Sequence, residues 1–324
     1  MDKLAIIRKP IEQEVVAFSS YFKSQFKSDV TLLNSALQYV CESTGKLMRP
    51  MLLLLAAKSC GCVSQETFAA AASLELLHTA SLLHDDVVDE SDVRRGSPSL
   101  NAIHGNRVAI LTGDYIFSLA LKNAAQTKNV EVIEQLSQLG CTLSGGEMIQ
   151  LQTQKNGTFD EDNYFDIVKG KTASLFASCA YIGALVSNKS SDLAASLRRF
   201  GEIVGICFQI KDDIFDYYSS DIGKPTGSDM REGKITLPAI YVLRTSNLPS
   251  VSVIREKLAV AKELDENEIK LLIELSKSEG GIEYALSKIE QLRLEALSVL
   301  PISIPRDCRD ALIGYMDYAI NREK

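Results

Sequence analysis

The feature that most constrains the fold is an apolar stretch ending in carboxylates, HTASLLHDDVVD, from His78 to Asp89. Residues four apart share one face of a helix, so Asp85 and Asp89 point the same way, with Ser81 one turn deeper. The Gly and Pro within 94–98 end this helix. A helix C-terminus carries partial negative charge, so an acidic cluster there requires a cation. Oxygen ligands with room for water suit Mg²⁺. The cluster consists of Asp85, Asp86, Asp89, Glu90 and Asp92.

A second acidic cluster repeats this arrangement in QIKDDIFD, residues 209–216. Asp212 and Asp216 lie one turn apart, with Gln209 on their side. A loop that carries Lys224 follows. One Asp-Asp-x-x-Asp motif is weak evidence, because acidic residues often only solvate a helix end. Both motifs, however, lie among apolar residues, and buried carboxylates need partners. We therefore expect the two helix ends to face each other across a cavity and to hold metal ions that bridge to a phosphorylated ligand.

Helical periodicity runs through most of the chain, and strand signals are nearly absent. No linker rich in Pro, Gly or Ser divides the sequence. We predict an all-α fold, a single domain spanning 1–324 in which a dozen or so helices surround a central cavity. The expected helices cover 10–41 (one or two helices), 50–60, 65–89, 107–127, 130–153, 160–168, 171–187, 192–218, 236–246, 252–263, 266–278, 281–298 and 305–320.

Composition and charge argue against several classes of protein. The net charge is −7 and no block of Lys and Arg occurs, so nucleic acid is not an expected partner. The seven cysteines fall mostly in apolar helical patterns, as free thiols do in a reducing compartment. The first ten residues lack the features of a signal peptide, and the apolar run 51–57 is too short to span a bilayer. We expect a cytoplasmic protein without a transmembrane segment.

Basic residues near the first cluster have two interpretations. Arg94 and Arg95 either form a solvated turn, with local pairing to Asp92, or clamp phosphate with their planar guanidinium groups. Lys46 and Arg49 either lie as a cationic pair at a helix start or belong to the same site. The residues alone leave both questions open.

Other candidates are ambiguous one at a time. His78 alone is typical of a satisfied core histidine. Lys171-Thr172 opens an apolar helix but lacks the upstream glycine and the strand of a nucleotide-binding loop. No serine or cysteine nucleophile stands with a base and an orienting group.

Taken together, several segments resemble the trans-isoprenyl diphosphate synthases, or polyprenyl synthetases, and most closely the long-chain bacterial members of octaprenyl type. The resemblance extends from about Gly45 to the C-terminus. The matching segments, in family order, are Gly45-Lys-Leu-Met-Arg-Pro50, His78–Asp89, Arg94-Arg-Gly96, Leu111-Thr-Gly-Asp-Tyr115, Lys171-Thr172, Gln209–Asp216 and Glu232-Gly-Lys-Ile-Thr-Leu-Pro238.

The resemblance implies the isoprenoid synthase fold, a homodimer and a set of site residues. Asp85 and Asp89 would hold two Mg²⁺ ions and Asp212 a third. Asp86, Asp213 and Asp216 complete the two catalytic motifs. The allylic diphosphate would be surrounded by Arg94, Lys171, Thr172, Gln209, Lys224 and Lys234, and isopentenyl diphosphate would be bound by Lys46, Arg49, His78 and Arg95.

The chemistry implied is a head-to-tail condensation. Metal ions and cations stabilise the departing diphosphate of an allylic substrate, such as farnesyl or geranylgeranyl diphosphate, and leave an allylic cation. The Thr172 hydroxyl and the Gln209 oxygen offer dipoles to that cation. The isopentenyl double bond attacks it, and the departing diphosphate takes the proton, so no protein base is needed.

Product length is expected to follow from the residues that precede the first cluster. Bulky residues four and five places before it block the product tunnel early in short-chain members of the family, and here these positions are Ser81 and Ala80. We predict a product of C35 or longer, suited to a quinone side chain, with peripheral membrane contact for its release.

Three alternatives stay open at this stage: a farnesyl or geranylgeranyl diphosphate synthase, a terpene cyclase or head-to-head synthase, and a non-catalytic subunit of a heteromeric synthase. Two departures from the family pattern leave residues without a role. Glu147 and Gln150 replace the Gly-Gln…Asp form of shorter-chain members, and Arg322 and Lys324 match a basic C-terminal tail only loosely.

Overall fold

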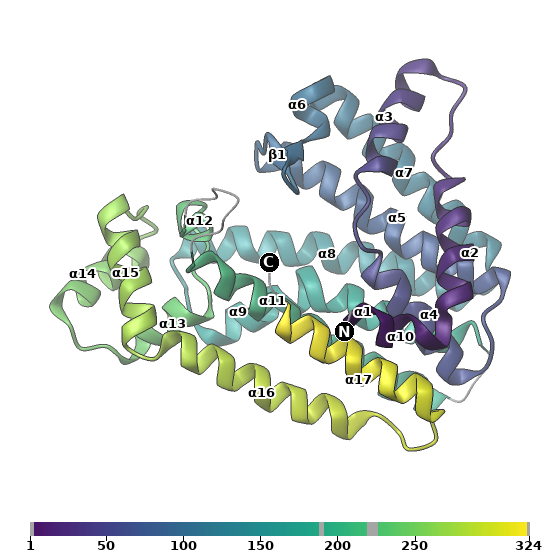
Figure 1. The fold of residues 1–324 in the computed structure, drawn as a ribbon. Helices are drawn as coiled ribbons and strands as arrows, with labels where there is room; N and C mark the ends of the chain where they lie inside the picture. The colour runs from purple at the N-terminus through teal and green to yellow at the C-terminus, as the bar shows by residue number, and fades with distance from the viewer. Residues whose placement is uncertain (1–2, 188–190, 219–225, 323–324) are drawn as a thin grey trace. The chain divides into compact units, whose positions relative to one another are not determined.

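The fold is all-α, as predicted. A computed structural model describes residues 3–187, 191–218 and 226–322 (Figure 1). Within these ranges, strands are confined to a two-residue antiparallel ribbon of β1 (Val93–Arg94) and β2 (Ser97–Pro98). No described helix combines the length and apolar composition needed to cross a membrane.

The chain divides into two compact units, each described here by itself. Unit 1 comprises residues 1–140, 178–201 and 300–315, and unit 2 comprises residues 141–177, 202–299 and 316–324. That the whole chain forms one domain around a central cavity stays a prediction. Four helices contribute residues to both units: α8 (Val130–Asn156), α10 (Ser174–Leu185), α11 (Ser191–Asp216) and α17 (Arg306–Asn321).

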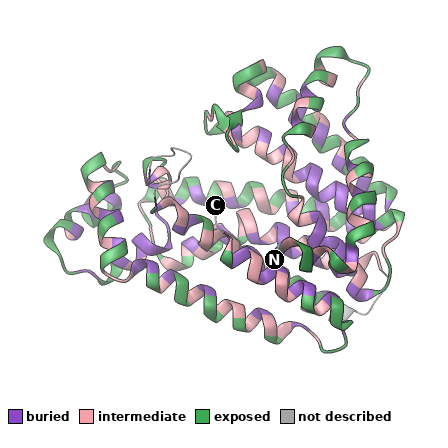
Figure 2. Ribbon diagram, in the orientation of Figure 1, coloured by how far each residue is buried: buried purple, intermediate pink, exposed green. Residues whose placement is uncertain are grey.

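Unit 1 is built around one long helix, α5 (Gln65–Val88). The Ser64 side chain accepts a hydrogen bond from the Thr67 N–H and the Thr67 side chain pairs with the Ser64 backbone, so a capping box starts the helix. Buried residues follow without interruption from Thr67 to Leu77 (Figure 2). The helix packs against its neighbours α4 and α7. The other helices of this unit are α1 (Lys3–Arg8), the 3₁₀ turn η1 (Lys9–Ile11), α2 (Glu12–Lys23), α3 (Thr31–Glu42), α4 (Met48–Cys60), α6 (Leu100–His104) and α7 (Asn106–Gln126).

Unit 2 surrounds the C-terminal half of α11 with shorter helices. Its elements are α9 (Glu161–Val168), the π turn η2 (Lys169–Ala173), α12 (Ser228–Arg231), α13 (Leu237–Thr245), α14 (Pro249–Ala259), α15 (Glu266–Ser278) and α16 (Gly281–Val299). Helices α13 and α16 approach closely because position 281 is glycine, where a Cβ would lie 2.5 Å from the Pro238 carbonyl oxygen.

Most predicted helices exist, and the differences concern short elements. The stretch 10–41 is interrupted between α2 and α3, and the helix expected at 50 begins at Met48. The helices α6 and α12 were not predicted, since a single turn leaves no periodicity to detect. The π turn was also missed, because it differs from an α-helix only in its hydrogen-bond spacing.

A glycine substitution tests the packing of unit 1. A Cβ on Gly183 of α10 would lie 2.4 Å from the Leu53 carbonyl oxygen of α4, so Gly183→Ala forces two backbones apart. We expect it to lower the free energy of unfolding by about 1–3 kcal/mol in urea titrations. Gly140→Ala is the matched control, because nothing lies within 4 Å of its Cβ position in α8. That change should be neutral or stabilise by up to about 1 kcal/mol. Equal effects of the two changes would contradict the close packing.

Candidate functional site

The first acidic cluster lies at the C-terminal end of α5, as predicted. Helical hydrogen bonding continues to the cap, where the Asp89 N–H donates to the Asp85 carbonyl at 2.8 Å. The carboxylates of Asp85 and Asp89 therefore share one helix face. Asp85 is half-buried and Asp89 is exposed, whereas Asp86 is only 2% exposed. The first and last acids are thus placed differently from the middle one.

The middle acid, Asp86, is paired with Arg94. The β1–β2 ribbon turns the chain back at Arg95 and Gly96, both at positive φ, and Arg94 reaches α5. The Nε and Nη2 atoms of Arg94 both lie 2.6 Å from Asp86 Oδ1. Burial raises the pKa of Asp86, and Arg94 opposes that shift. The local pairing of Arg94 with Asp92 that the sequence left open is therefore replaced by a buried pair with Asp86.

Beside this pair, unit 1 contains a cavity of about 70 Å³ with a basic mouth. Arg95 lies against the loop before α4: its Nη1 donates to the Ser43 carbonyl at 3.2 Å. A Cβ on Gly45 would lie 2.7 Å from the same Nη1, so glycine permits this approach. The polar side chains lining the cavity include Glu75, His78, Thr79, Asp86, Arg94 and Arg95. Of the residues predicted to bind isopentenyl diphosphate, the cavity lining includes His78 and Arg95.

Electrostatics make this cavity suited to an anion. Burial first, and then the charges of Arg49, Arg95 and Arg94, hold the pKa of His78 well below its usual value. Burial and the nearby Arg49 and Arg94 also lower the pKa of Arg95. Glu75 is the opposing charge: it is 6% exposed, and burial raises its pKa against the pull of Arg49 and Arg95. Three guanidinium groups, those of Arg49, Arg94 and Arg95, face two carboxylates, those of Glu75 and Asp86, so one positive charge is left over, which favours an anion.

Two other predicted cations, Lys46 and Arg49, follow Gly45, one of the residues that line this cavity. Lys46 is exposed and Arg49 is half-buried at the start of α4. Leu47 between them adopts the left-handed conformation with φ of 52°, which turns the chain into the helix. The influence of Arg49 on the pKa values of Glu75 and His78 places its charge near the cavity.

The second acidic cluster ends α11 in unit 2, and its three acids have different partners. Arg322 Nη2 donates to Asp212 Oδ1 at 2.6 Å, and its guanidinium lies 3.7 Å from the centre of the Phe208 ring. Asp216 accepts the backbone N–H groups of Ser228 and Asp229 at 3.0 and 3.1 Å and so holds the start of α12. Asp212 is exposed and Asp216 half-buried.

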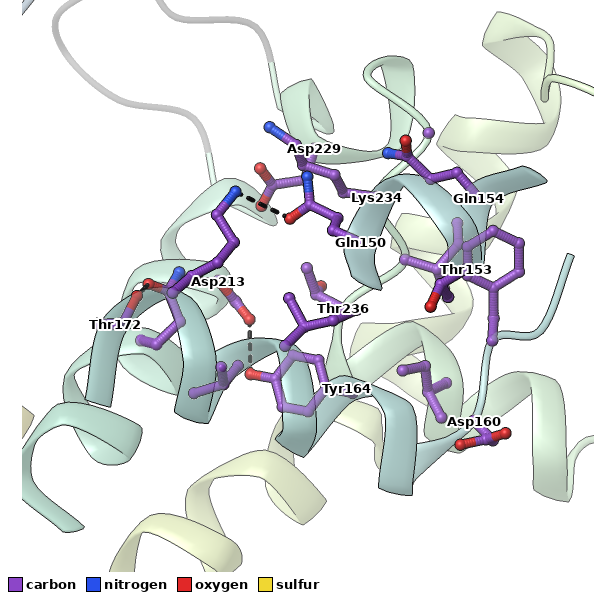
Figure 3. Close-up of a pocket in the computed structure, with 18 residues that line it drawn as sticks. Gln150, Thr153, Gln154, Asp160, Tyr164, Thr172, Asp213, Asp229, Lys234 and Thr236 are labelled. Atoms are coloured by element: carbon purple, nitrogen blue, oxygen red, sulfur yellow. Dashed lines mark hydrogen bonds between the residues drawn. The ribbon is translucent and has the colours of Figure 1, made fainter. Parts of the chain in front are cut away.

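The middle acid, Asp213, anchors a buried chain of hydrogen bonds. Tyr164 on α9 donates its hydroxyl to Asp213 Oδ2 at 2.6 Å, and the Gln209 amide donates to Oδ1 at 2.8 Å. The Thr172 hydroxyl donates to the Gln209 carbonyl oxygen at 2.7 Å. The predicted residues Thr172 and Gln209 are therefore brought together, and Asp213 orients the Gln209 amide. Tyr164, which sequence reasoning missed, holds Asp213 in turn, as Figure 3 shows.

This network lines a cavity of about 190 Å³ in unit 2. Lys171 and Thr172 enter it from the π turn, an irregularity often found at functional sites. Lys234 also lines it and pairs with Glu232 at 2.5 Å. The predicted residue Lys224 lies outside the described residues. Charged and polar side chains that line the cavity are Gln150, Thr153, Gln154, Asp160, Tyr164, Lys171, Thr172, Gln209, Asp213, Asp229, Lys234 and Thr236.

Asp229 is a second residue that sequence reasoning missed. Burial, followed by the charges of Asp213 and Asp216, raises its pKa to about 8, and Lys234 opposes the shift. Burial likewise raises the pKa of Asp213 to about 7. Asp229 follows the second motif in a loop of mixed polarity, so no periodic pattern marked it. The cavity therefore holds more carboxylate than its cations compensate.

The acids of the two motifs fit a divalent cation that keeps part of its hydration shell. Among the described residues, no three His, Cys, Asp or Glu side chains are grouped closely enough to hold an ion by themselves. Mg²⁺ commonly binds through one or two carboxylates and completes its octahedron with water and phosphate oxygens. The Asp85/Asp89 face and the exposed Asp212 suit that mode. Asp85 belongs to unit 1 and Asp212 to unit 2, and that they share one site stays a prediction.

Comparisons with known proteins find one family model and relatives that align over nearly the full chain. Residues 30–276 match the family model described as polyprenyl synthetase. The chain is 31% identical over 314 residues to the octaprenyl diphosphate synthase of Escherichia coli strain K12, an alignment that covers 96% of this chain and 97% of that protein.

Solved structures show the same similarity. A geranylgeranyl pyrophosphate synthase from Bacteroides thetaiotaomicron is 43% identical with a TM-score of 0.86, covering 99% of this chain and all of that one. A polyprenyl synthase from Caulobacter crescentus CB15, complexed with calcium and isoprenyl diphosphate, is 29% identical with a TM-score of 0.89, covering 98% and 97%.

The uncompensated acids of unit 2 predict a pH dependence. The pKa of Asp229 is higher in the folded state than in the unfolded chain, so the folded protein binds the extra proton. The contribution of Asp229 to the stability of the metal-free protein should therefore fall as the pH rises from about 4 to about 8. Asn in place of Asp229 should flatten this decline and raise the melting temperature at pH 8 but not at pH 4, as followed by circular dichroism. An equal shift at both pH values would contradict a role for the carboxylate charge.

Proposed function

Because the chain belongs to the polyprenyl synthetase family, we propose that it condenses an allylic diphosphate with isopentenyl diphosphate, head to tail. The observation that supports this proposal is that two cavities, one in each unit, are lined by basic side chains. One is the arginine-lined cavity of unit 1, and the other is the cavity of unit 2 with Lys171 and Lys234. An enzyme that joins two diphosphates needs both, whereas a terpene cyclase needs one.

The two sites divide the substrates. Isopentenyl diphosphate binds at Arg95 and His78, with Lys46 and Arg49 beside them. The allylic diphosphate binds at Lys171 and Lys234, whose ammonium groups donate to phosphate oxygens. The outer acids of the two motifs, Asp85, Asp89 and Asp212, hold Mg²⁺, and Lys224 and Arg94 are proposed to complete the allylic site.

Bond changes balance without a protein base. Bound Mg²⁺ supplies a Lewis acid that neutralises the diphosphate leaving group. The allylic C–O bond breaks and leaves a cation, which faces the oxygens of Thr172 and Gln209. The isopentenyl double bond forms the new C–C bond, and the departing diphosphate takes the proton. The Tyr164–Asp213 pair holds the Gln209 amide, so its carbonyl oxygen keeps one orientation through the step.

A product of C35 or longer is proposed, with a shorter farnesyl or geranylgeranyl product as the alternative. Ala80 is buried and Ser81 half-buried on α5, and both side chains are small. Small residues one turn before the acidic cluster leave room for a growing chain. The relatives include both kinds of enzyme, a long-chain octaprenyl diphosphate synthase and a geranylgeranyl pyrophosphate synthase. A role in quinone side chains and a cytoplasmic location stay predictions.

A homodimer is proposed from the surface of α7. Ile110, Phe117 and Leu121 recur at helical spacing along one face of this helix, each at least 40% exposed. An apolar stripe of this kind on a described helix is typical of a helix–helix interface between copies. Sedimentation of the pure protein as a monomer would contradict it.

Activity tests the proposed function. The pure protein with farnesyl diphosphate, isopentenyl diphosphate and Mg²⁺ should release diphosphate and form longer prenyl diphosphates. Asp85→Ala and Asp212→Ala should each lower kcat by about a hundredfold or more, because each removes a metal ligand. Asp192→Ala, an exposed acid at the start of α11, is the matched control and should keep full activity. Unchanged activity in both site variants, or no consumption of isopentenyl diphosphate by the wild type, would refute the proposal.

Product size tests the placement of the tunnel. Ala80→Phe and Ser81→Phe each add a ring beneath the first cluster, so the principal product should become shorter by several C5 units. Chromatography of the dephosphorylated products measures this directly. A product length unchanged in both variants would exclude a tunnel along this face of α5.

A further inference from the structure

The motif on α8 that the sequence left without a role lies beside Lys171. Glu147 and Gln150 are three residues apart and therefore project from one face of the helix. Lys171 Nζ lies 2.5 Å from Glu147 Oε2, and it donates to Gln150 Oε1 at 3.1 Å. The Gln150 amide in turn donates to Glu147 Oε1 at 3.2 Å. The three side chains form a closed triangle, and all of them belong to unit 2.

The backbones fix this triangle in place. Position 146 is glycine, where a Cβ would lie 2.9 Å from the Lys171 nitrogen and 3.0 Å from the Gly170 carbonyl carbon. The reverse also holds: a Cβ built on Gly170 would lie 3.0 Å from the Gly146 Cα. Helix α8 and the π turn therefore touch backbone to backbone, one residue away from both Glu147 and Lys171. Their separation is set by the fold, not by a flexible loop.

The Lys171 ammonium group has one N–H donor beyond those that Glu147 and Gln150 accept. An ammonium group has three N–H donors, and Glu147 and Gln150 take two of them. The third is left for a ligand in the cavity, which Lys171 and Gln150 both line. A free lysine side chain loses rotamer entropy on being ordered, and here that ordering precedes the ligand. The pair with Glu147 also cancels one positive charge at the site.

We propose that Glu147 and Gln150 are positioning residues that hold the Lys171 ammonium for the diphosphate leaving group. The inference rests on the proposed function and deepens it. Glu147 fixes the direction of the third donor, and its negative charge keeps the diphosphate from binding too tightly to be released. Gln150 keeps the carboxylate itself oriented.

The test combines a charge removal with a double-mutant cycle. Glu147→Gln keeps the size of the side chain and removes its charge. We expect kcat to fall about tenfold, with the KM for isopentenyl diphosphate unchanged, because only the leaving group loses its oriented donor. In a Lys171→Met background the same change should have no further effect, since Glu147 acts through Lys171. Glu134→Gln, an exposed change on the same helix, is the control.

A relocated charge provides the rescue. The double variant E147Q/Q150E moves the carboxylate to the other side of the ammonium, and its kcat should return to within about threefold of the wild type. An unchanged kcat in Glu147→Gln, an equal loss in the Lys171→Met background, or no recovery in a folded double variant would each overturn the proposal. Circular dichroism and the melting temperature establish that each variant folds.

A binding measurement separates this inference from the proposed function. Should the wild type fail to extend farnesyl diphosphate, calorimetry with inorganic diphosphate and Mg²⁺ still tests the pair. Glu147→Gln should then bind diphosphate about threefold more tightly, and only when Lys171 is present. The same affinity with and without Glu147, in both backgrounds, would refute the positioning role independently of the reaction.

Discussion

Carboxylates at the C-terminal ends of two apolar helices are the constraint on which the rest of the site depends. The helix dipole and burial both oppose negative charge at these ends, so each carboxylate requires a donor or a cation. Much of the irregular structure supplies those donors. The β1–β2 ribbon brings Arg94 to Asp86, α9 brings Tyr164 to Asp213, and the first turn of α12 offers its N–H groups to Asp216.

In both motifs the middle acid is buried more deeply than the outer acids, and this difference follows from helix geometry. One residue further along a helix turns the side chain by about 100°, so the second acid of each motif points away from the first. In both motifs it points inward: Asp86 is 2% exposed and Asp213 is 5% exposed. Each accepts hydrogen bonds from protein donors, as Asp212 and Asp216 also do. The outer acids differ from the middle ones in being more exposed. The buried side chains of Asp86 and Asp213 therefore hold neighbouring elements in place: the β1–β2 ribbon through Arg94 and α9 through Tyr164.

Sequence reasoning reached the helices and the ends of α5 and α11 because these depend on local periodicity and on breakers. It could not identify the partner of Arg94, since Asp92 was nearer in sequence and only the ribbon geometry selects Asp86. Tyr164 and Asp229 were missed for a related reason: their roles depend on contacts between distant segments. Glu75 did carry a signal, as a charge inside the Ala/Leu run of α5, three residues before His78.

The electrostatic contrast between the two cavities also bears on the chemistry. In unit 1 the arginines keep His78 neutral, so its imidazole can donate to a phosphate oxygen but holds no proton that it readily gives up. In unit 2 the acids exceed the cations until metal and substrate arrive. The Thr172 hydroxyl donates to the Gln209 carbonyl oxygen and the Gln209 amide donates to Asp213, so neutral, oriented dipoles line the cavity of unit 2 beside these acids.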